Sequence, residues 1–142
     1  MKKIIAFDLD DTLAITKSPI TDEMSELLTD LLTHYDVCII SGGKFEQFKK
    51  QVVDRLEAPA HSLNKLHLMP TCGTRYYRYD ELGEKWALQY AEDLTEEQKK
   101  KIISTLEKCA KEVGLWEEKP DGDIIEDLSL IHISEPTRQA EI

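Results

Sequence analysis

Short apolar runs alternate with longer amphipathic segments in the first half of the chain. Ile4–Phe7 and Val37–Ile40 lack the polar alternation of a half-exposed strand, so each predicts a strand buried on both faces of a parallel sheet. Between them, Thr21 begins a segment that predicts a helix ending near His34. Its apolar stripe has helical spacing and comprises Met24, Leu27, Leu28, Leu31 and Leu32. The alternation predicts an α/β fold, a Rossmann-like open parallel sheet with right-handed crossovers.

The alternation continues toward the middle of the chain. Ser41-Gly42-Gly43 predicts a turn into a second helix, and Leu66–Met69 predicts a third strand, ended by Pro70. The apolar stripe of this second helix comprises Phe45, Phe48, Val52 and Leu56. Arg75–Tyr79 and Trp86–Tyr90 then predict a β pair that leaves the parallel layer. Thr95–Gln98 is a capping box, and the helix it begins should end near Gly114, so we expect a second lobe starting near Lys85.

Length and charge exclude several classes of protein. The chain has 142 residues, enough for one ordinary domain, with 18 basic and 28 acidic side chains and a formal charge of −10. Nucleic acid and anionic membrane are therefore not expected as partners, because both bind basic surfaces. The apolar runs are too short to span a membrane and no signal peptide is recognisable, so the expected location is the cytoplasm. The three widely spaced cysteines should be reduced and structural.

The last residues require a separate interpretation. Residues 128–138 read as the translation of the end of a transposase-type sequencing adapter, and residues 139–142 follow in the same frame. We interpret 128–142 as a non-native tail and expect the gene to continue beyond Asp127. Without the tail the chain remains acidic, so the argument from charge stands.

Three carboxylates follow the first apolar run in Phe7–Leu13. Asp8 and Asp10 are two residues apart and can share a face, where paired carboxylates suit a hard divalent ion such as Mg²⁺. The site should lie at the carboxyl end of a central strand, where open α/β sheets place their ligands. Asp8 would be a nucleophile toward phosphorus and Asp10 a general acid and base. Thr12 would position the loop, while Ser41 and the Gly42 amide, at a helix start, would hold phosphate oxygens.

This pattern resembles the haloacid dehalogenase superfamily of phosphotransferases. Asp8–Thr12 matches its Asp-x-Asp-x-Thr first motif, and Ser41 after an apolar strand matches its second. The resemblance implies a nucleophile at Asp8, an acid/base at Asp10, Mg²⁺ held by the Asp8 carboxylate and the Asp10 backbone carbonyl, and a small phosphorylated metabolite as partner. Ser41-Gly42-Gly43 with Phe45-Glu46, Pro70 before Gly73 and the helix from Thr95 to Val113 are similar to the branch with a large α+β cap (IIB), which includes eukaryotic-type phosphomannomutases. Asp11 departs from the commoner Gly.

The resemblance also divides the chain. Residues 1–84 would be the N-terminal part of the core, 85–127 the start of an incomplete cap, and 128–142 the tail. The family completes its site with a later Lys and a later acidic cluster. Lys119–Asp123 imitates that pair but fits a turn within the cap better, and Lys44 is a weak substitute for the Lys. We therefore expect the polypeptide as written to be close to inactive.

Three functions remain open from the sequence. The first is a Mg²⁺-dependent hydrolase of small phosphate monoesters, sugar phosphates in particular, that works through an aspartyl-phosphate. The second is a hexose phosphomutase of the phosphomannomutase type. The third, from another class, is a receiver-like phosphoacceptor module, which needs an Asp at the end of the third strand where this chain has Pro70.

Overall fold

The structure, a computed structural model, describes residues 3–116, 124–127 and 131–133. Contacts divide the chain into two compact units, Met1–Glu92 and Asp93–Ile142, which we describe separately. The turn expected at 119–123 and most of the tail at 128–142 lie outside the described residues. Within the described residues no helix is both long enough and apolar enough to cross a bilayer.

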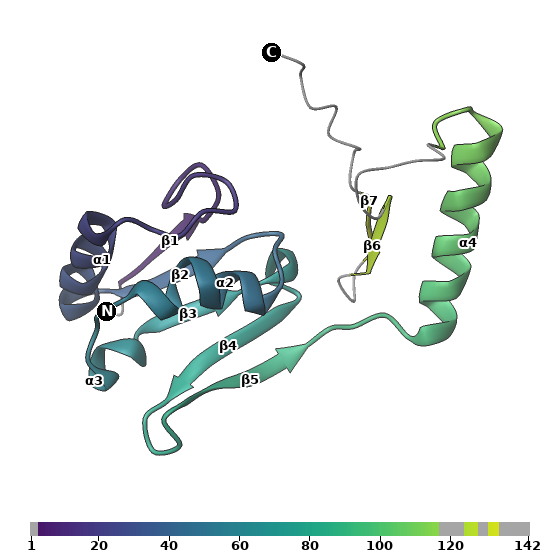
Figure 1. Ribbon diagram of the computed structural model, residues 1–142. Coiled ribbons are helices and arrows are strands. Elements are labelled where there is room, and N and C mark those ends of the chain that lie inside the picture. Colours follow the sequence, from purple (N-terminus) through teal and green to yellow (C-terminus); the bar gives the residue numbers. More distant parts are fainter. Residues whose placement is uncertain (1–2, 117–123, 128–130, 134–142) are drawn as a thin grey trace, which may run out of the picture. The chain divides into compact units, whose positions relative to one another are not determined.

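The first unit contains a five-stranded mixed sheet in the order β1-β2-β3-β4-β5 (Figure 1). Parallel pairing joins β1 (Ile4–Asp8) to β2 (Asp36–Ile40) and β2 to β3 (Leu66–Met69). Antiparallel pairing joins β3 to β4 (Arg75–Asp80) and β4 to β5 (Lys85–Ala91). The α/β class and all five strands are confirmed.

The expectation that the last two strands leave the parallel layer is wrong. They extend the same sheet, because β4 pairs with β3 and the Tyr77 ring stacks on Phe45 with centroids 4.1 Å apart. Tyr77 and Trp86 also pack against the core. The division between units falls after Glu92, whereas a start at Lys85 would separate the two strands of one hairpin. The assignment of 85–127 to a cap stays a prediction.

The first helix of this unit begins where its capping residue predicts. Thr21 accepts a hydrogen bond from the Met24 amide at 3.2 Å and caps α1 (Asp22–His34). After β2 come α2 (Phe45–Gln51) and the 3-10 turn η1 (Val53–Arg55), so the helix expected to reach Leu56 is regular only to Gln51. The short α3 (Ala60–Leu63) precedes β3, and the 3-10 turn η2 (Thr71–Gly73) follows it.

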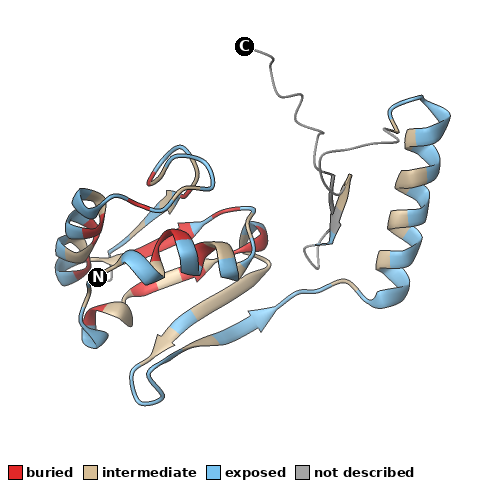
Figure 2. Cartoon of the chain, viewed as in Figure 1, coloured by how far each residue is buried: buried red, intermediate tan, exposed pale blue. Residues whose placement is uncertain are grey.

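The core lies on one face of this sheet. Figure 2 shows buried residues along β2, β3, α1 and α2. The core cluster contains Val37 and Ile39 of β2, Leu66 and Leu68 of β3, Leu28 and Leu32 of α1, and Phe48 of α2. Leu27, predicted in the α1 stripe, is 59% exposed instead. Successive residues of a helix point about 100° apart, so α1 buries Leu28 and Leu32 and turns Leu27 toward water.

The first strand differs from the sequence expectation. We expected β1 to be central and covered on both faces, but among the described residues it pairs only with β2 and forms the edge of the sheet. Its residues alternate between exposed and half-buried, and Ile4 is 56% exposed. The order β1-β2-β3 extends the sheet in one direction, and no described strand returns to the other side of β1.

The second unit is small. Its long helix, α4 (Glu96–Glu112), has the expected capping box at Thr95 and Gln98, and Gly114 follows the helix with a φ of 72°. β6 (Ile125–Asp127) pairs with β7 (Ile131–Ile133) in an antiparallel ribbon. The Lys99 ammonium lies 3.2 Å from Glu96 and 3.4 Å from Asp127, linking α4 to β6. β7 belongs to the segment 128–142, whose interpretation as non-native stays a prediction.

Candidate active site

The carboxyl ends of the three parallel strands meet at one edge of the sheet. In the register, Asp8 pairs with Ile40 and Ile40 with Met69, so the loops after β1, β2 and β3 start at the same level. Two backbone hydrogen bonds tie the second loop to the third: the Cys72 amide donates to the Ser41 carbonyl at 3.0 Å, and the Thr71 amide donates to the Gly43 carbonyl at 2.9 Å. This is the edge where open α/β sheets bind ligands.

Asp8 is the last residue of β1, and its side chain is exposed. Within the described part of the chain, its carboxylate makes no hydrogen bond or ion pair. A nucleophile needs an oxygen that is not occupied by donors, because each donor stabilises the lone pair that must attack. The position of Asp8 is thus compatible with the predicted role, which itself stays a prediction.

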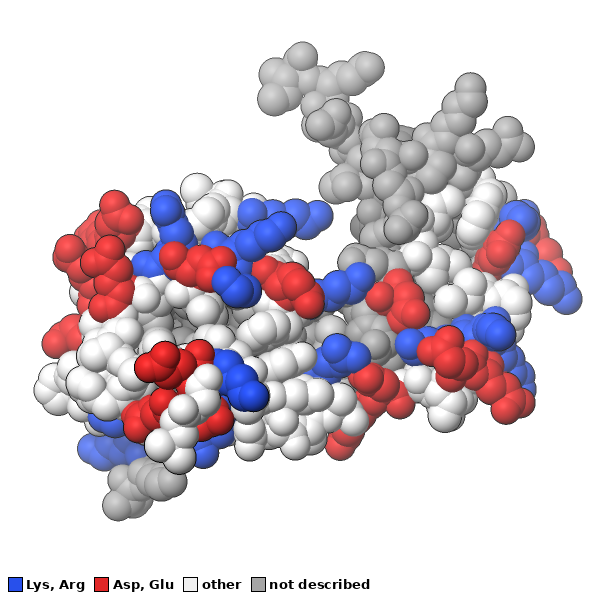
Figure 3. All heavy atoms as spheres, turned by 60° about the horizontal axis from the view of Figure 1, so that its bottom comes forward, with Lys and Arg blue, Asp and Glu red and all other residues white. Residues whose placement is uncertain are grey.

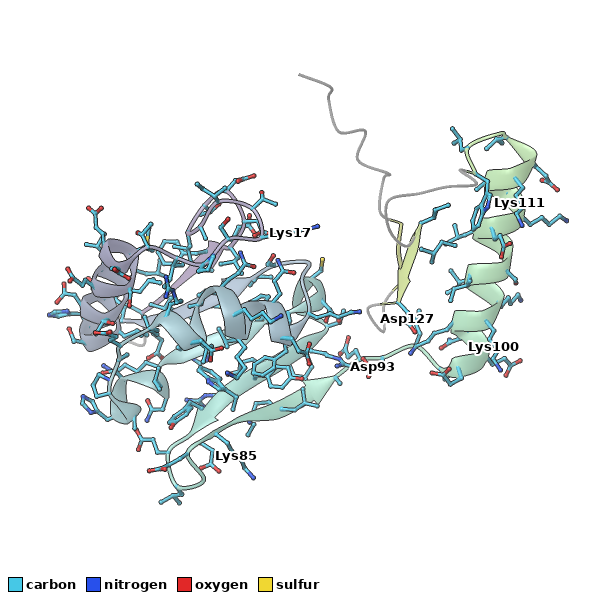
Figure 4. The ribbon with its side chains drawn as sticks, viewed as in Figure 1. Lys17, Lys85, Asp93, Lys100, Lys111 and Asp127 are labelled. Carbon is cyan, nitrogen blue, oxygen red and sulfur yellow. The ribbon has the colours of Figure 1, made fainter. Side chains whose placement is uncertain are left out.

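Asp10, by contrast, is held by several donors. Its Oδ1 accepts from the Lys17 backbone amide and from Gln51 Nε2, both at 3.0 Å, and its Oδ2 accepts from Gln47 Nε2 at 3.3 Å. Figure 4 shows Lys17 on the loop after β1, with its side chain extending outward, so the backbone of Lys17 provides the contact. Within the described residues, the Asp10 carboxylate is therefore held by hydrogen bonds, whereas the Asp8 carboxylate is not.

Asp11 stands where the resembled motif more often has glycine, and its backbone has a conformation that suits glycine. Its φ is 58°, in the left-handed region that glycine adopts freely and that Asp tolerates better than most residues. The Thr16 hydroxyl and amide donate to its carboxylate at 2.7 and 3.0 Å, and these bonds hold the pKa of Asp11 below its usual range. Thr12, predicted to position this loop, is exposed, and its amide approaches the Leu9 carbonyl at 3.4 Å.

The predicted phosphate-binding residues lie on the loop after β2. Ser41 is buried and Gly42 is exposed. The expectation that Gly42 lies at a helix start is wrong, because α2 begins at Phe45 and Gly42 belongs to the loop before it. Any contact of Ser41 and Gly42 with phosphate would use loop groups near the exit of β1 and stays a prediction.

Sequence reasoning missed three residues at this edge. Gln47 and Gln51 reach Asp10 from α2, and a signal existed for Gln51, a polar residue between the apolar positions Phe48 and Val52. The third is Thr71, buried and with a φ of 49°, followed by Cys72 at 55°. A β-branched residue in the left-handed region is strained, and such strain is frequent at functional sites.

Two depressions lie on other parts of the first unit. One depression of about 600 Å³ lies beside α1 and η1, with Asp22, Glu26, Asp30 and Arg55 in its lining, and another lies at the tip of the β4–β5 hairpin. Neither is lined by Asp8 or Asp10. On the face drawn in Figure 3, acidic and basic side chains are interspersed. We give more weight to the chemistry of the Asp8 edge, because the residues lining the depressions include no activated nucleophile.

Asp8 and Asp10 offer oxygen ligands of the kind that Mg²⁺ prefers, but these are too few for a full coordination shell. Asp8 offers free carboxylate oxygens, whereas the Asp10 side chain is engaged by amides, so its backbone carbonyl is the better candidate ligand. In the described ranges, no group of three or more His, Cys, Asp or Glu side chains is placed to hold a metal ion. A full coordination shell would need ligands beyond these two residues.

Comparison with solved structures shows proteins of similar fold. An IMP-nucleotidase of Plasmodium falciparum with IMP bound has a TM-score of 0.58 to this chain at 16% identity, over 79% of this chain and 34% of its own. A C-terminally truncated form of the same nucleotidase also has a TM-score of 0.58, at 17% identity over 80% of this chain. At identities this low the likeness shows a shared fold, so the fold that the sequence resemblance implied is confirmed.

One protein of established name matches part of the sequence. Phosphomannomutase 2 of Dictyostelium discoideum is 41% identical to this chain over 49 residues, which are 34% of this chain and 20% of that protein. This match agrees with the resemblance to phosphomannomutases drawn from the sequence. No protein-family model matches the chain. The chain therefore spans about a third of the nucleotidase and matches a fifth of the phosphomannomutase.

Proposed function

We propose that this chain is part of a Mg²⁺-dependent cytoplasmic phosphotransferase that hydrolyses small phosphate monoesters, sugar phosphates in particular. The observation that carries the proposal is the contrast at the exit of β1, where the Asp8 carboxylate is exposed and unpaired within the described residues while Asp10 is held by donors. A free carboxylate suits attack, and a fixed one suits proton transfer.

The reaction would take place in two steps. In the first, an Asp8 oxygen forms a bond to phosphorus, the bond from phosphorus to the ester oxygen breaks, and Asp10 gives its proton to the leaving alkoxide. In the second, Asp10 takes a proton from water, the water oxygen attacks phosphorus, and the bond from Asp8 to phosphorus breaks. Bound Mg²⁺ would offset the negative charge of the phosphoryl group. Ser41 and the Gly42 amide would hold its oxygens, and Thr12 would support the loop.

A hexose phosphomutase is the second candidate, favoured by the match to a phosphomannomutase. It differs in the fate of the aspartyl-phosphate, which returns its phosphoryl group to a sugar instead of to water. Release of inorganic phosphate from mannose 6-phosphate would indicate the hydrolase, whereas conversion to mannose 1-phosphate would indicate the mutase. The receiver-like module has less support, because β3 ends at Met69 and is followed by Pro70 where an acceptor Asp is needed.

Substitution of the nucleophile tests the proposal. In a product of the gene extended beyond Asp127, Asp8→Asn should reduce Mg²⁺-dependent turnover of a phosphate monoester at least about 1,000-fold, because the amide cannot form the phosphoryl bond. Asp30→Asn, an exposed substitution on α1, is the matched control and should retain turnover. Survival of turnover in the Asp8 variant would contradict the assignment.

The same assay tests whether this chain is sufficient. We propose that the 142-residue polypeptide turns over far more slowly than the extended product, because its described residues offer too few metal ligands and no recognisable cation to clamp the phosphate. Equal turnover of the two would contradict this part of the proposal and leave the role of Asp8 standing.

A further inference from the structure

We infer that Gln51 is a positioning residue that fixes the carboxylate of Asp10 in one orientation. The inference rests on the proposed function of Asp10 as acid and base. It goes beyond that function by naming the residue that orients Asp10.

Gln51 is placed to connect three segments. It is the last residue of α2 and is only 2% exposed. Its side-chain Nε2 donates to Asp10 Oδ1 at 3.0 Å and to the Ser18 carbonyl at 2.8 Å, and its backbone carbonyl accepts from the Ile20 amide at 2.8 Å. The side chain therefore joins the end of α2 to the loop after β1, and the backbone joins it to the segment that leads to α1.

Packing alone does not explain a glutamine here. Among the described residues, Gln51 Oε1 is buried without a hydrogen-bond partner. A buried unsatisfied acceptor is unfavourable, and an apolar side chain of similar length, such as methionine, would avoid that cost. The position retains a donor in spite of this penalty, and the donor is used on Asp10 and Ser18.

The two oxygens of Asp10 are not equivalent. Oδ1 accepts from the Lys17 amide and from Gln51, which together occupy both of its lone pairs. Among the residues that the structure describes, Oδ2 accepts from Gln47 alone, at the longer distance of 3.3 Å, and so retains a lone pair. Oδ1 is therefore the anchored oxygen of this carboxylate, and Gln51 provides one of its two donors.

Gln47 is the adjustable member of the pair. Its side chain is half-exposed and lies over Gly43, with Oε1 only 2.3 Å from the place that a Cβ of residue 43 would take. A long, half-exposed contact can open when Oδ2 meets a substrate or a water molecule. The buried Gln51 contact cannot open without moving α2 or the loop, so Gln51 sets the orientation of Asp10.

The side-chain rotamer of Asp10 provides the test, because it requires no turnover. In this chain, NMR three-bond couplings from Asp10 Cγ to the backbone N and C′ should report one χ1 rotamer. In Gln51→Met we expect loss of the single rotamer and a mixture of two or three staggered states, with α2 still folded. Lys50→Met, on the exposed side of the same helix, is the control and should leave the couplings unchanged. A folded Gln51→Met protein with unchanged Asp10 couplings would overturn the inference.

A reciprocal variant covers the case in which Gln51→Met does not fold. In Asp10→Asn, the side-chain amide resonances of Gln51 should shift clearly, while those of Gln89, whose amide donates to the Ala87 carbonyl, should not. Unchanged Gln51 resonances would also overturn the inference. Neither readout depends on Asp8, so retained turnover in Asp8→Asn would defeat the proposed function while these results stood on their own.

Discussion

The backbone conformation of Asp11 shows how this loop accepts a residue other than glycine. Asp11 takes a conformation that glycine adopts without strain, and Thr16 offsets part of the cost with two hydrogen bonds to the Asp11 carboxylate. Asp11 thus has a local hydrogen-bond partner in Thr16, five residues later. The motif around Asp8 and Asp10 keeps its form although one of its usual residues has changed.

At the same scale, Gly43 gives Gln47 its room. In Gly43→Ala, the new Cβ would meet Gln47 Oε1, so we expect Gln47 to turn away from Asp10 while Gln51 keeps its contact. Stability should change by less than about 1 kcal/mol, because the displaced group is the end of a flexible side chain. NMR should show the Gln47 side-chain amide shifted and that of Gln51 unmoved. Gly42→Ala is the control, since its Cβ would lie at an ordinary 3.7 Å from Cys72 Sγ.

The cysteines differ in burial and so in reactivity. Burial raises the pKa of the Cys38 thiol above its usual value, so less thiolate forms at a given pH, whereas Cys72 and Cys109 are exposed. With iodoacetamide at pH 8, mass spectrometry should find Cys72 and Cys109 modified at least about tenfold faster than Cys38. Equal modification of all three would contradict the burial of β2.

The raised pKa of the Cys38 thiol also affects stability. The unfolded chain loses this proton at a lower pH than the folded chain, so the free energy of unfolding should fall as pH rises through 9.0.

At the scale of elements, α1 tests which residues of an apolar stripe face the core. Leu28 is 3% exposed and Leu27 is 59% exposed, although both are leucines of one helix. Leu28→Ala should lower the free energy of unfolding by about 3 kcal/mol, because it removes buried contacts and leaves a cavity. Leu27→Ala should change it by no more than about 0.5 kcal/mol. Urea unfolding measures both, and similar losses would mean that the helix is rotated from the orientation described here.

At the scale of the whole molecule, β1 leaves an open edge beside Asp8. The described residues place no strand on its other side, and an exposed edge offers unpaired N–H and C=O groups to another chain. We expect the polypeptide to self-associate through this edge as its concentration rises, and Ile4→Lys to reduce the association, because a charge on an edge strand opposes pairing. Sedimentation velocity measures the association. Leu82→Lys is the control, because Leu82 lies in the turn between β4 and β5 and is 99% exposed. A wild-type chain that stays monomeric throughout would contradict it.

Much of this molecule could be read from short stretches of sequence. Helix caps at Thr21 and Thr95 and the apolar runs of β1 to β3 are local patterns, because capping and side-chain periodicity depend on residues within a few positions. The Asp8–Thr12 motif is local for the same reason. The partners of a strand and of a buried side chain are not local, so the sequence did not disclose the edge position of β1, the return of the hairpin to the sheet, or the contact between Asp10 and Gln51, 41 residues apart. Only folding brings those groups together, and it is this packing that decided which of the two acids is held and which is free.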